Sequence, residues 1–583
     1  MIERIIESSV KNRFFVIILT AVAIIVGYWA LINTPVDAIP DLSDVQVIVY
    51  TKYPGQDPQT VEDQITYPLS TAMLSVPYAK VVRGYSFFGF SLVYVIFEDG
   101  TDLYWARSRV LEYLNFVKSR LPANVTPQLG PDATGVGWVY MYSLTSKKHD
   151  LAQLRSIQDW YLRYELMAVP GVSEVASLGG YVKQYQIEVD PEKLRAFKIP
   201  LSKVREAVKR SNMDVGGRLI EMAETEFMVR GKGYIKSVED IENIPISVDP
   251  EKHVPVLLKQ VARVQIGPEI RRGIAEMDGK GEVVTGIVEM RFGENALEVI
   301  KRVKERLSEL KESLPEGVKI HTSYDRSNLI LRAIRNLKSK IFEELIVVAL
   351  VCVLFLMHLP SSLVAIFTIP VGILLSLLCM RLLNINANIM SLSGIAIAIG
   401  VMVDASVVMV ENLHKHKERD QNIPFQELVI NSSKEVGPAL FFSLLIITIS
   451  FFPVFALEQQ EGRLFIPLAY TKTFAMAASS LLAITIVPVL MFYFVRGKVK
   501  PQDQSRLNRF FISTYRPIIN LVLRYPKSTI LSAAVVGLIT LFPYSKIGSE
   551  FMPPLNEGDL LYMPTTPPGI SITKAKELLQ QTN

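Results

Sequence analysis

The chain has 583 residues, of which 49% are hydrophobic and 20% charged, and its formal net charge at pH 7 is only +5. Its mean hydropathy is +0.27, so apolar segments able to cross a membrane must alternate with sizeable water-soluble parts. The small net charge gives no support for nucleic-acid binding, and the two cysteines, Cys352 and Cys379, lie inside apolar runs and exclude a disulfide framework.

Seven apolar runs are long enough to cross a membrane, or nearly so, and are predicted to be spanning helices. No small-residue cleavage site follows the first run, which is therefore expected to remain as a span. Basic residues gather before the first run, between the fourth and fifth, and between the sixth and seventh, so the positive-inside rule places the amino terminus in the cytoplasm. The runs cover residues 14–32, 341–358, 363–383, 389–412, 438–457, 467–495 and 529–544.

The long segment between the first two runs has roughly 300 residues, too many for a connecting loop, so a folded outer domain is predicted there. The chain then divides into six parts. These are a first span within 1–33, an outer domain over 34–340, spans two to six within 341–497, an amphipathic cytoplasmic connector over 498–528, a seventh span over 529–545, and the start of a second outer domain over 546–583.

The outer domain is predicted to be α+β, because strand-like and helix-like stretches alternate along it. This order fits a split βαβ sandwich, and a comparable pattern returns after Trp138 and near 283–314. An inserted docking subdomain is predicted over about 201–263. The first strands and helices are expected at 45–53, 60–74, 90–98 and 103–121.

The sequence also contains an internal repeat. A shift of 514 residues places the basic residue before span one, Arg13, on Lys527 before span seven. Transporters often contain such parallel repeats, and two complete copies would need roughly 1,030 residues, so the chain is expected to be the amino-terminal part of a longer protein. The same shift places Pro40, Thr51, Pro54 and Gly55 on Pro554, Thr565, Pro568 and Gly569.

Asp404 is the only charged residue in the fourth run between Ile389 and Val410. A carboxylate in the middle of a spanning helix costs about 2.5–3.5 kcal/mol on insertion scales, so it is rare without a partner or a task. In transporters that task is often to carry a proton. A carboxylate kept only for helix packing is the alternative.

Three segments carry a resemblance to a known family: PVDAIPDLSDVQVIVYTKYPGQDPQTVEDQITYPL, LGPDATGVGWVYMYSL and AIGVMVDASVVMVEN. They resemble the heavy-metal branch of the resistance–nodulation–division (RND) efflux pumps, most of all its copper/silver members. The resemblance covers the whole chain and implies an inner-membrane homotrimer that docks to a periplasmic adaptor and an outer-membrane channel. It implies the RND fold, in which the large α+β domain is periplasmic, and a proton relay at Asp404. The single Asp in GVMVDAS favours the monovalent-metal group.

The methionines are a separate line of evidence for the substrate, because Cu(I) and Ag(I) accept thioether ligands whereas Zn(II) and Co(II) prefer imidazole, carboxylate or thiolate. Met402 and Met409 are seven residues apart on one helical face and flank Asp404. Met476 and Met491 lie in span six, so the two spans are predicted to pair Met402 with Met476 and Met409 with Met491. These four positions and Met390 match a methionine relay in the copper/silver pumps. Methionine is also ordinary filler in apolar helices, which is the alternative.

Met563 is predicted to lie on the first strand of the second outer domain, where the first copy has Val49. The resemblance makes it one of three methionines of a periplasmic metal site, whose other members would follow Asn583. Packing on the buried face of a strand is the alternative. A further outer-domain methionine of the family falls near Ile270, which cannot ligate.

The remaining candidates carry weaker signals. His414 and His416 are expected to be solvated, and Lys472 is expected to reach the membrane interface rather than pair with Asp404. No GxxxxGK[ST] motif and no hydrolytic constellation occurs, so neither ATP as the energy source nor hydrolysis is indicated. Together with the resemblance, this predicts a cofactor-free transporter that exchanges Cu(I)/Ag(I) for protons, not an enzyme. A divalent-cation (Zn, Co, Ni or Cd) pump of the same fold, and a non-transporting gene fragment, are the alternatives.

Overall fold

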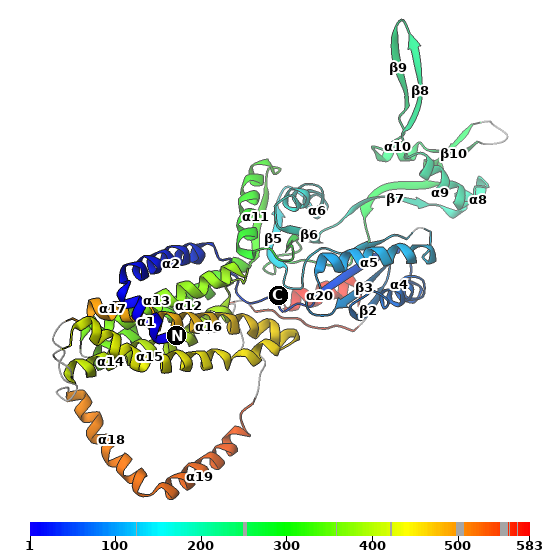
Figure 1. Cartoon of the computed structure of the whole chain (residues 1–583). Coiled ribbons are helices and arrows are strands. Elements are labelled where there is room, and N and C mark those ends of the chain that lie inside the picture. The colour runs from blue at the N-terminus through cyan, green and yellow to red at the C-terminus, as the bar shows by residue number, and fades with distance from the viewer. Residues whose placement is uncertain are drawn as a thin grey trace. The chain divides into compact units, whose positions relative to one another are not determined.

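The computed structural model describes the chain except residues 124, 249–253, 357, 420–422, 497–505, 549–557, 559, 568 and 583 (Figure 1). Pro554 and Pro568 of the internal repeat, and the first part of the connector predicted over 498–528, lie outside the described residues. The chain forms two compact units. Unit 1 comprises Met1–Val139, Met290–Lys301 and Asp325–Met563, and unit 2 comprises Tyr140–Glu289, Arg302–Tyr324 and Pro564–Asn583.

Unit 1 contains a four-stranded antiparallel sheet of order β2-β3-β1-β4. Side chains alternate between buried and half-buried along the strands, as expected for a sheet with one covered face. Helices α4 (Tyr67–Met73) and α5 (Leu103–Val117) share one apolar core with the sheet, and Asp102 caps α5 by accepting from the Trp105 N–H. The strands are β1 (Gln46–Lys52), β2 (Ala79–Phe87), β3 (Phe90–Phe97) and β4 (Pro127–Leu129).

A second four-stranded sheet, of order β14-β5-β13-β6, lies largely in unit 2. In both sheets the first covering helix contains a π-helical turn, at Glu62–Thr66 and at Gln158–Leu162, which is a structural sign of repeated subdomains. The predicted return of the split βαβ pattern is confirmed. The strands are β5 (Trp138–Ser146), β6 (Val172–Gly179), β13 (Val284–Met290) and β14 (Val318–Asp325), with helices α6 (Leu151–Ile157), α7 (Arg163–Met167) and α11 (Ala296–Leu310).

The inserted subdomain is wider than the predicted 201–263. Its stem is the antiparallel pair β7 (Lys183–Val189) and β12 (Ala262–Pro268), and its apolar core runs from Leu194 to Val264. An exposed hairpin projects from it (Figure 1), formed by β8 (Val215–Met222) and β9 (Thr225–Gly231). The smaller elements are α8 (Pro191–Ala196), α9 (Leu201–Arg210), α10 (Val238–Glu242), β10 (Pro245–Val248) and β11 (Pro255–Leu257).

In the described ranges, five helices are long and apolar enough to cross a membrane, and a bent helix pair would make six. Helix α12 (Arg326–Leu356) is not among them because Lys340, Glu343 and Glu344 interrupt it, so the span predicted over 341–358 stays a prediction. The five are α2 (Arg13–Asn33), α13 (Leu359–Leu382), α14 (Ile389–Arg419), α15 (Phe425–Ile449) with the short turn that follows it, and α19 (Pro526–Tyr544).

The bent pair corrects the continuous helix predicted over 467–495. The run forms α16 (Gln459–Ile484) and α17 (Ile486–Phe494), which meet at Thr485 with a bend of 50°. Pro488 explains the break, because it has no N–H for the Ile484 carbonyl and its ring clashes with that carbonyl. The fifteen-residue register between Met476 and Met491 therefore does not hold across the bend.

An amphipathic helix precedes the first apolar helix along the chain. Helix α1 (Ile2–Lys11) is held against α15 by Glu7, which accepts from Lys11 at 2.6 Å and from Lys434 at 2.5 Å. These hydrogen bonds lower the pKa of Glu7 to about 2, so α1 keeps this anchor at neutral pH. The remaining helices are α18 (Arg506–Arg524) and α20 (Ile572–Thr582).

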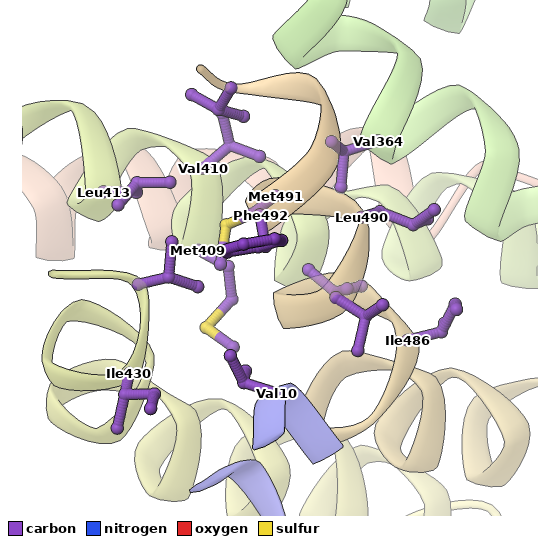
Figure 2. Close-up of a cluster of buried hydrophobic side chains, with 14 of the residues drawn as sticks. Val10, Val364, Met409, Val410, Leu413, Ile430, Ile486, Leu490, Met491 and Phe492 are labelled. Carbon is purple, nitrogen blue, oxygen red and sulfur yellow. The ribbon is translucent and has the colours of Figure 1, made fainter. Parts of the chain in front are cut away.

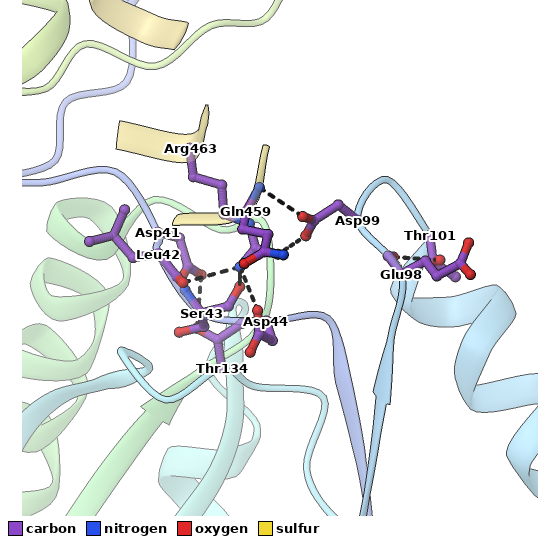
Figure 3. Close-up of polar contacts among 10 residues, drawn as sticks. All are labelled: Asp41, Leu42, Ser43, Asp44, Glu98, Asp99, Thr101, Thr134, Gln459 and Arg463. Atoms are coloured by element: carbon purple, nitrogen blue, oxygen red, sulfur yellow. Dashed lines mark hydrogen bonds and ion pairs between the residues drawn. The ribbon is translucent and has the colours of Figure 1, made fainter. Parts of the chain in front are cut away.

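Arg463, in the first turns of α16, ties this helix to the first sheet of unit 1 (Figure 3). Its guanidinium donates to the carbonyls of Leu42 (3.1 Å) and Ser43, just before β1, and pairs with Asp99, just after β3. The Gln459 N–H donates to the second Asp99 oxygen at 3.0 Å. Helix α16, which carries Met476, is thereby fixed to the first sheet of unit 1.

We expect Arg463→Ala to free the chain around Leu42 and Ser43, because it removes several charge-assisted hydrogen bonds at once. Bonds to charged groups contribute about 1.5–3 kcal/mol each, and partial solvent exposure reduces this. Hydrogen exchange of residues 42–44 should therefore accelerate clearly in Arg463→Ala and less in Arg463→Lys. Equal protection in all three proteins would show that the tie contributes nothing.

Candidate functional site

The centre of the bundle is the packing of α14 against α13 and α16. Gly394 permits the close approach, because a Cβ there would lie 2.6 Å from the Leu468 carbonyl oxygen of α16. Hydroxyl groups link the helices further, with Thr368 and Ser406 3.0 Å apart and Ser376 donating to the Thr471 carbonyl at 3.0 Å. The first bond links α13 to α14 and the second links α13 to α16, so the three helices are tied together around the side chains that face inward.

Met402 and Met476 lie together in one buried apolar cluster. Their side chains are 2% and 0% exposed, and the cluster is otherwise built from alanines of α14 and α16 and from Leu444. The Met402 methyl group lies directly against Gly372 of α13, where any Cβ would clash with it. Small residues thus leave room for two thioethers at the middle of the bundle.

Met409 and Met491 lie together in a second buried cluster, nearer the end of the bundle where α14 finishes. Both side chains are fully buried, and Figure 2 shows their sulfur atoms among aliphatic side chains. Val10 of α1 closes one side of this cluster. The structure therefore brings together the two predicted pairs, although the helix that supplies Met476 and Met491 is bent between them.

The donors at these two positions are soft. Thioether sulfur binds Cu(I) and Ag(I), while Zn(II) and Co(II) need imidazole, thiolate or carboxylate groups. Within the ranges that the structure describes, no group of three or more His, Cys, Asp or Glu side chains lies in a metal-binding arrangement. Both cysteines are free, and they lie on α12 and α13.

The other two methionines are not joined to these pairs. Met390 is half-buried at the start of α14. Met563 is 77% exposed, and the stretch Leu560–Pro567 contains no strand, which corrects the predicted strand. A strand exists only when a neighbour accepts its hydrogen bonds, and no described strand pairs with this stretch. Val49, its repeat equivalent, is by contrast buried on β1.

Asp404 faces away from both methionine pairs. It is exposed on a stripe of α14 that also includes Ile397 (49% exposed) and Val408 (39% exposed). Among the described residues, no hydrogen bond or ion pair reaches its carboxylate. Exposed apolar side chains lie before and after the acid along this stripe, so Asp404 lies on an uncovered face of the bundle.

Two side chains differ from expectation. Lys472 is 7% exposed rather than interfacial, and its Nζ lies 3.2 Å from the centre of the Phe451 ring. His414 is 2% exposed rather than solvated, because α14 continues to Arg419 instead of ending near residue 412 and keeps His414 on its packed face. His416 pairs with Glu435 at 2.5 Å.

Sequence reasoning also missed Gly372 and Gly394, although glycines inside apolar spans signal close helix approach.

Apolar helices long enough to cross a membrane, joined to split βαβ subdomains, form the fold of the RND proteins. Residues 5–583 match the AcrB/AcrD/AcrF family, and the chain belongs to it.

Individual relatives narrow the class further. The chain is 57% identical to the cation efflux system protein CusA of Escherichia coli (strain K12) and 56% identical to the putative cation efflux system protein SilA of Salmonella typhimurium. Each alignment covers 100% of this chain and 57% of the relative. A crystal structure of a heavy metal efflux pump (crystal form II) is similar with a TM-score of 0.87 at 30% identity, covering 99% of this chain and 56% of that one. The chain thus spans somewhat over half the length of the relatives it matches.

Proposed function

We propose that the chain forms part of a proton-driven pump that exports Cu(I) and Ag(I). The observation that carries this proposal is the pairing of four buried methionines along α14, α16 and α17. The pairs are about 10 Å apart along α14, since seven residues separate Met402 from Met409. A soft ion passing along this path meets thioethers at both levels.

The proposed energy source is proton entry at Asp404. Protonation from the outside removes the charge of the carboxylate, which lowers its cost in the membrane and lets the helices repack. Release of the proton to the inside restores the charge and the first arrangement. One proton crossing 100 mV supplies about 2.3 kcal/mol for this cycle.

The proposed assembly is that of the family. The protein is a multi-pass protein of the bacterial inner membrane, with a cytoplasmic amino terminus and periplasmic porter subdomains. Three copies form a homotrimer that docks to a periplasmic adaptor and an outer-membrane channel. The exposed β8–β9 hairpin, the basic segments beside the spans and the similarity to CusA support this arrangement. Metal enters the path from the cytoplasm or binds at a periplasmic cleft that includes Met563.

Metal uptake into proteoliposomes tests the proposal. With the protein reconstituted and the lumen acidic, we expect Ag(I) to accumulate and Zn(II) not to, and each Ag(I) transported should raise the luminal pH. Transport of Zn(II) in preference to Ag(I) would contradict the substrate, and Ag(I) transport that persists without a proton gradient would contradict the coupling.

A further inference from the structure

Two histidines meet beside the Met409–Met491 cluster, at the end of the bundle where α14 finishes. His358 immediately precedes α13, and His414 lies near the end of α14. The Ser361 hydroxyl lies 2.7 Å from His358 Nδ1 and 2.8 Å from His414 Nε2, and the ring centres are 6.0 Å apart. Ring nitrogens from two helices are thus aimed at one small space.

The three side chains differ in burial, and His358 is the one nearest the surface. His358 is half-buried, whereas Ser361 is fully buried and His414 is 2% exposed. The Ser361 O–H donates to only one imidazole, so the other imidazole either donates its own N–H or is left without a bond. A hydroxyl alone therefore does not satisfy two neutral imidazoles that both present a lone pair.

This group continues the methionine path. Val364, one turn after Ser361, and Val410, one turn before His414, belong to the same apolar cluster as Met409 and Met491. Along α14 the possible ligands follow at 402, 409 and 414, which correspond to steps of about 10 and 8 Å. His414 therefore lies between this cluster and the half-buried His358 at the edge of the bundle.

We infer that His358 and His414 bind a Cu(I) or Ag(I) ion as the entry site of the methionine path, an inference that rests on the proposed function. Imidazole is a good ligand for copper, and two nitrogens that face one point suit an ion that needs few ligands. In the metal-bound form each neutral imidazole carries its single proton on the ring nitrogen that faces away from the ion, so binding to neutral rings releases no proton. The ion takes the place of the hydrogen bonds to Ser361, and the more exposed His358 receives it first.

Copper binding to the purified protein tests the site apart from transport. Met402, Met409, Met476 and Met491 are first changed to leucine, which removes the thioether pairs. Cu(I) affinity is then measured by competition with a chromophoric chelator, and the ligands are identified by X-ray absorption. His414→Ala and, separately, the half-exposed His358→Ala should each weaken this Cu(I) site by about tenfold or more and reduce the copper–nitrogen signal.

Ser361→Ala is the matched control, because it removes the bridging hydroxyl and leaves both imidazoles. We expect it to retain Cu(I) binding. Unchanged copper binding in both histidine variants, or an equal loss in Ser361→Ala, would show that the three residues form only a structural link and would overturn the inference. Ag(I) uptake by the unmodified protein is scored separately, so failure of this site and failure of the proposed function give different results.

Discussion

Asp404→Asn is expected to abolish metal transport and metal resistance while leaving the folded protein and its assembly intact. Asparagine matches the shape of aspartate but carries no proton that can be released, so the helix is held permanently in its uncharged form. No hydrogen bond or ion pair to the carboxylate is present in the described part of the chain, so the substitution breaks no such contact there. Replacing the charged carboxylate with a neutral amide also lowers part of the insertion cost, which is about 2.5–3.5 kcal/mol for a charged residue at the middle of a span.

The measurement is proton-driven Ag(I) uptake in proteoliposomes, with the oligomeric state determined in parallel by size-exclusion chromatography. Glu411→Gln is the matched control, because Glu411 lies two turns further along the same helix in an exposed ion pair with Lys415 at 3.0 Å. We expect uptake to fall to the background of empty liposomes in Asp404→Asn and to remain near normal in Glu411→Gln. Normal Ag(I) uptake by Asp404→Asn would contradict the proposed role of Asp404 as a proton relay.

The double substitution Met402→Leu and Met409→Leu is expected to remove Ag(I) and Cu(I) transport with little loss of stability. Leucine fills nearly the same volume as methionine, and such exchanges usually cost less than about 1.5 kcal/mol per site. It cannot coordinate a soft ion, so each buried pair keeps only one thioether. A pump for divalent cations would be unaffected by the same exchange.

Met380→Leu supplies the control for this experiment. Met380 is fully buried on α13 in a cluster that contains none of the four paired methionines. Uptake of Ag(I) and thermal stability should both stay close to those of the unmodified protein in Met380→Leu. Ag(I) uptake at the normal rate in the double variant would mean that the four methionines are packing residues only.

Periodicity predicted the elements whose burial pattern is strong. Alternation along β1 and β3 and the long apolar runs of α2, α13 and α14 were sufficient, because these segments bury one face or cross the bilayer whatever their neighbours are. The pairing of Met402 with Met476 was also predicted, from the spacing of the methionines along the two spans and from the resemblance, and the two side chains share one buried cluster.

The differences arise where tertiary packing or a single residue overrides the local pattern. Pro488 breaks span six at Thr485, a signal that was present in the sequence but is weaker than the apolar run around it. The burial of His414 depends on contacts with α13, fifty residues away, which no local pattern reports. Met563 illustrates a third cause, because a strand depends on a partner and not on its own composition.

The bend at Thr485 places the two methionines of one span, which are the proposed metal ligands, on two separate helical segments. Met476 belongs to α16, which Arg463 anchors to the first sheet of unit 1. Met491 belongs to α17, beyond the bend. A change of the 50° angle therefore alters the spacing of Met409 and Met491 and leaves the spacing of Met402 and Met476 unchanged. In the proposed pump, the two methionine levels can therefore change their spacing one at a time.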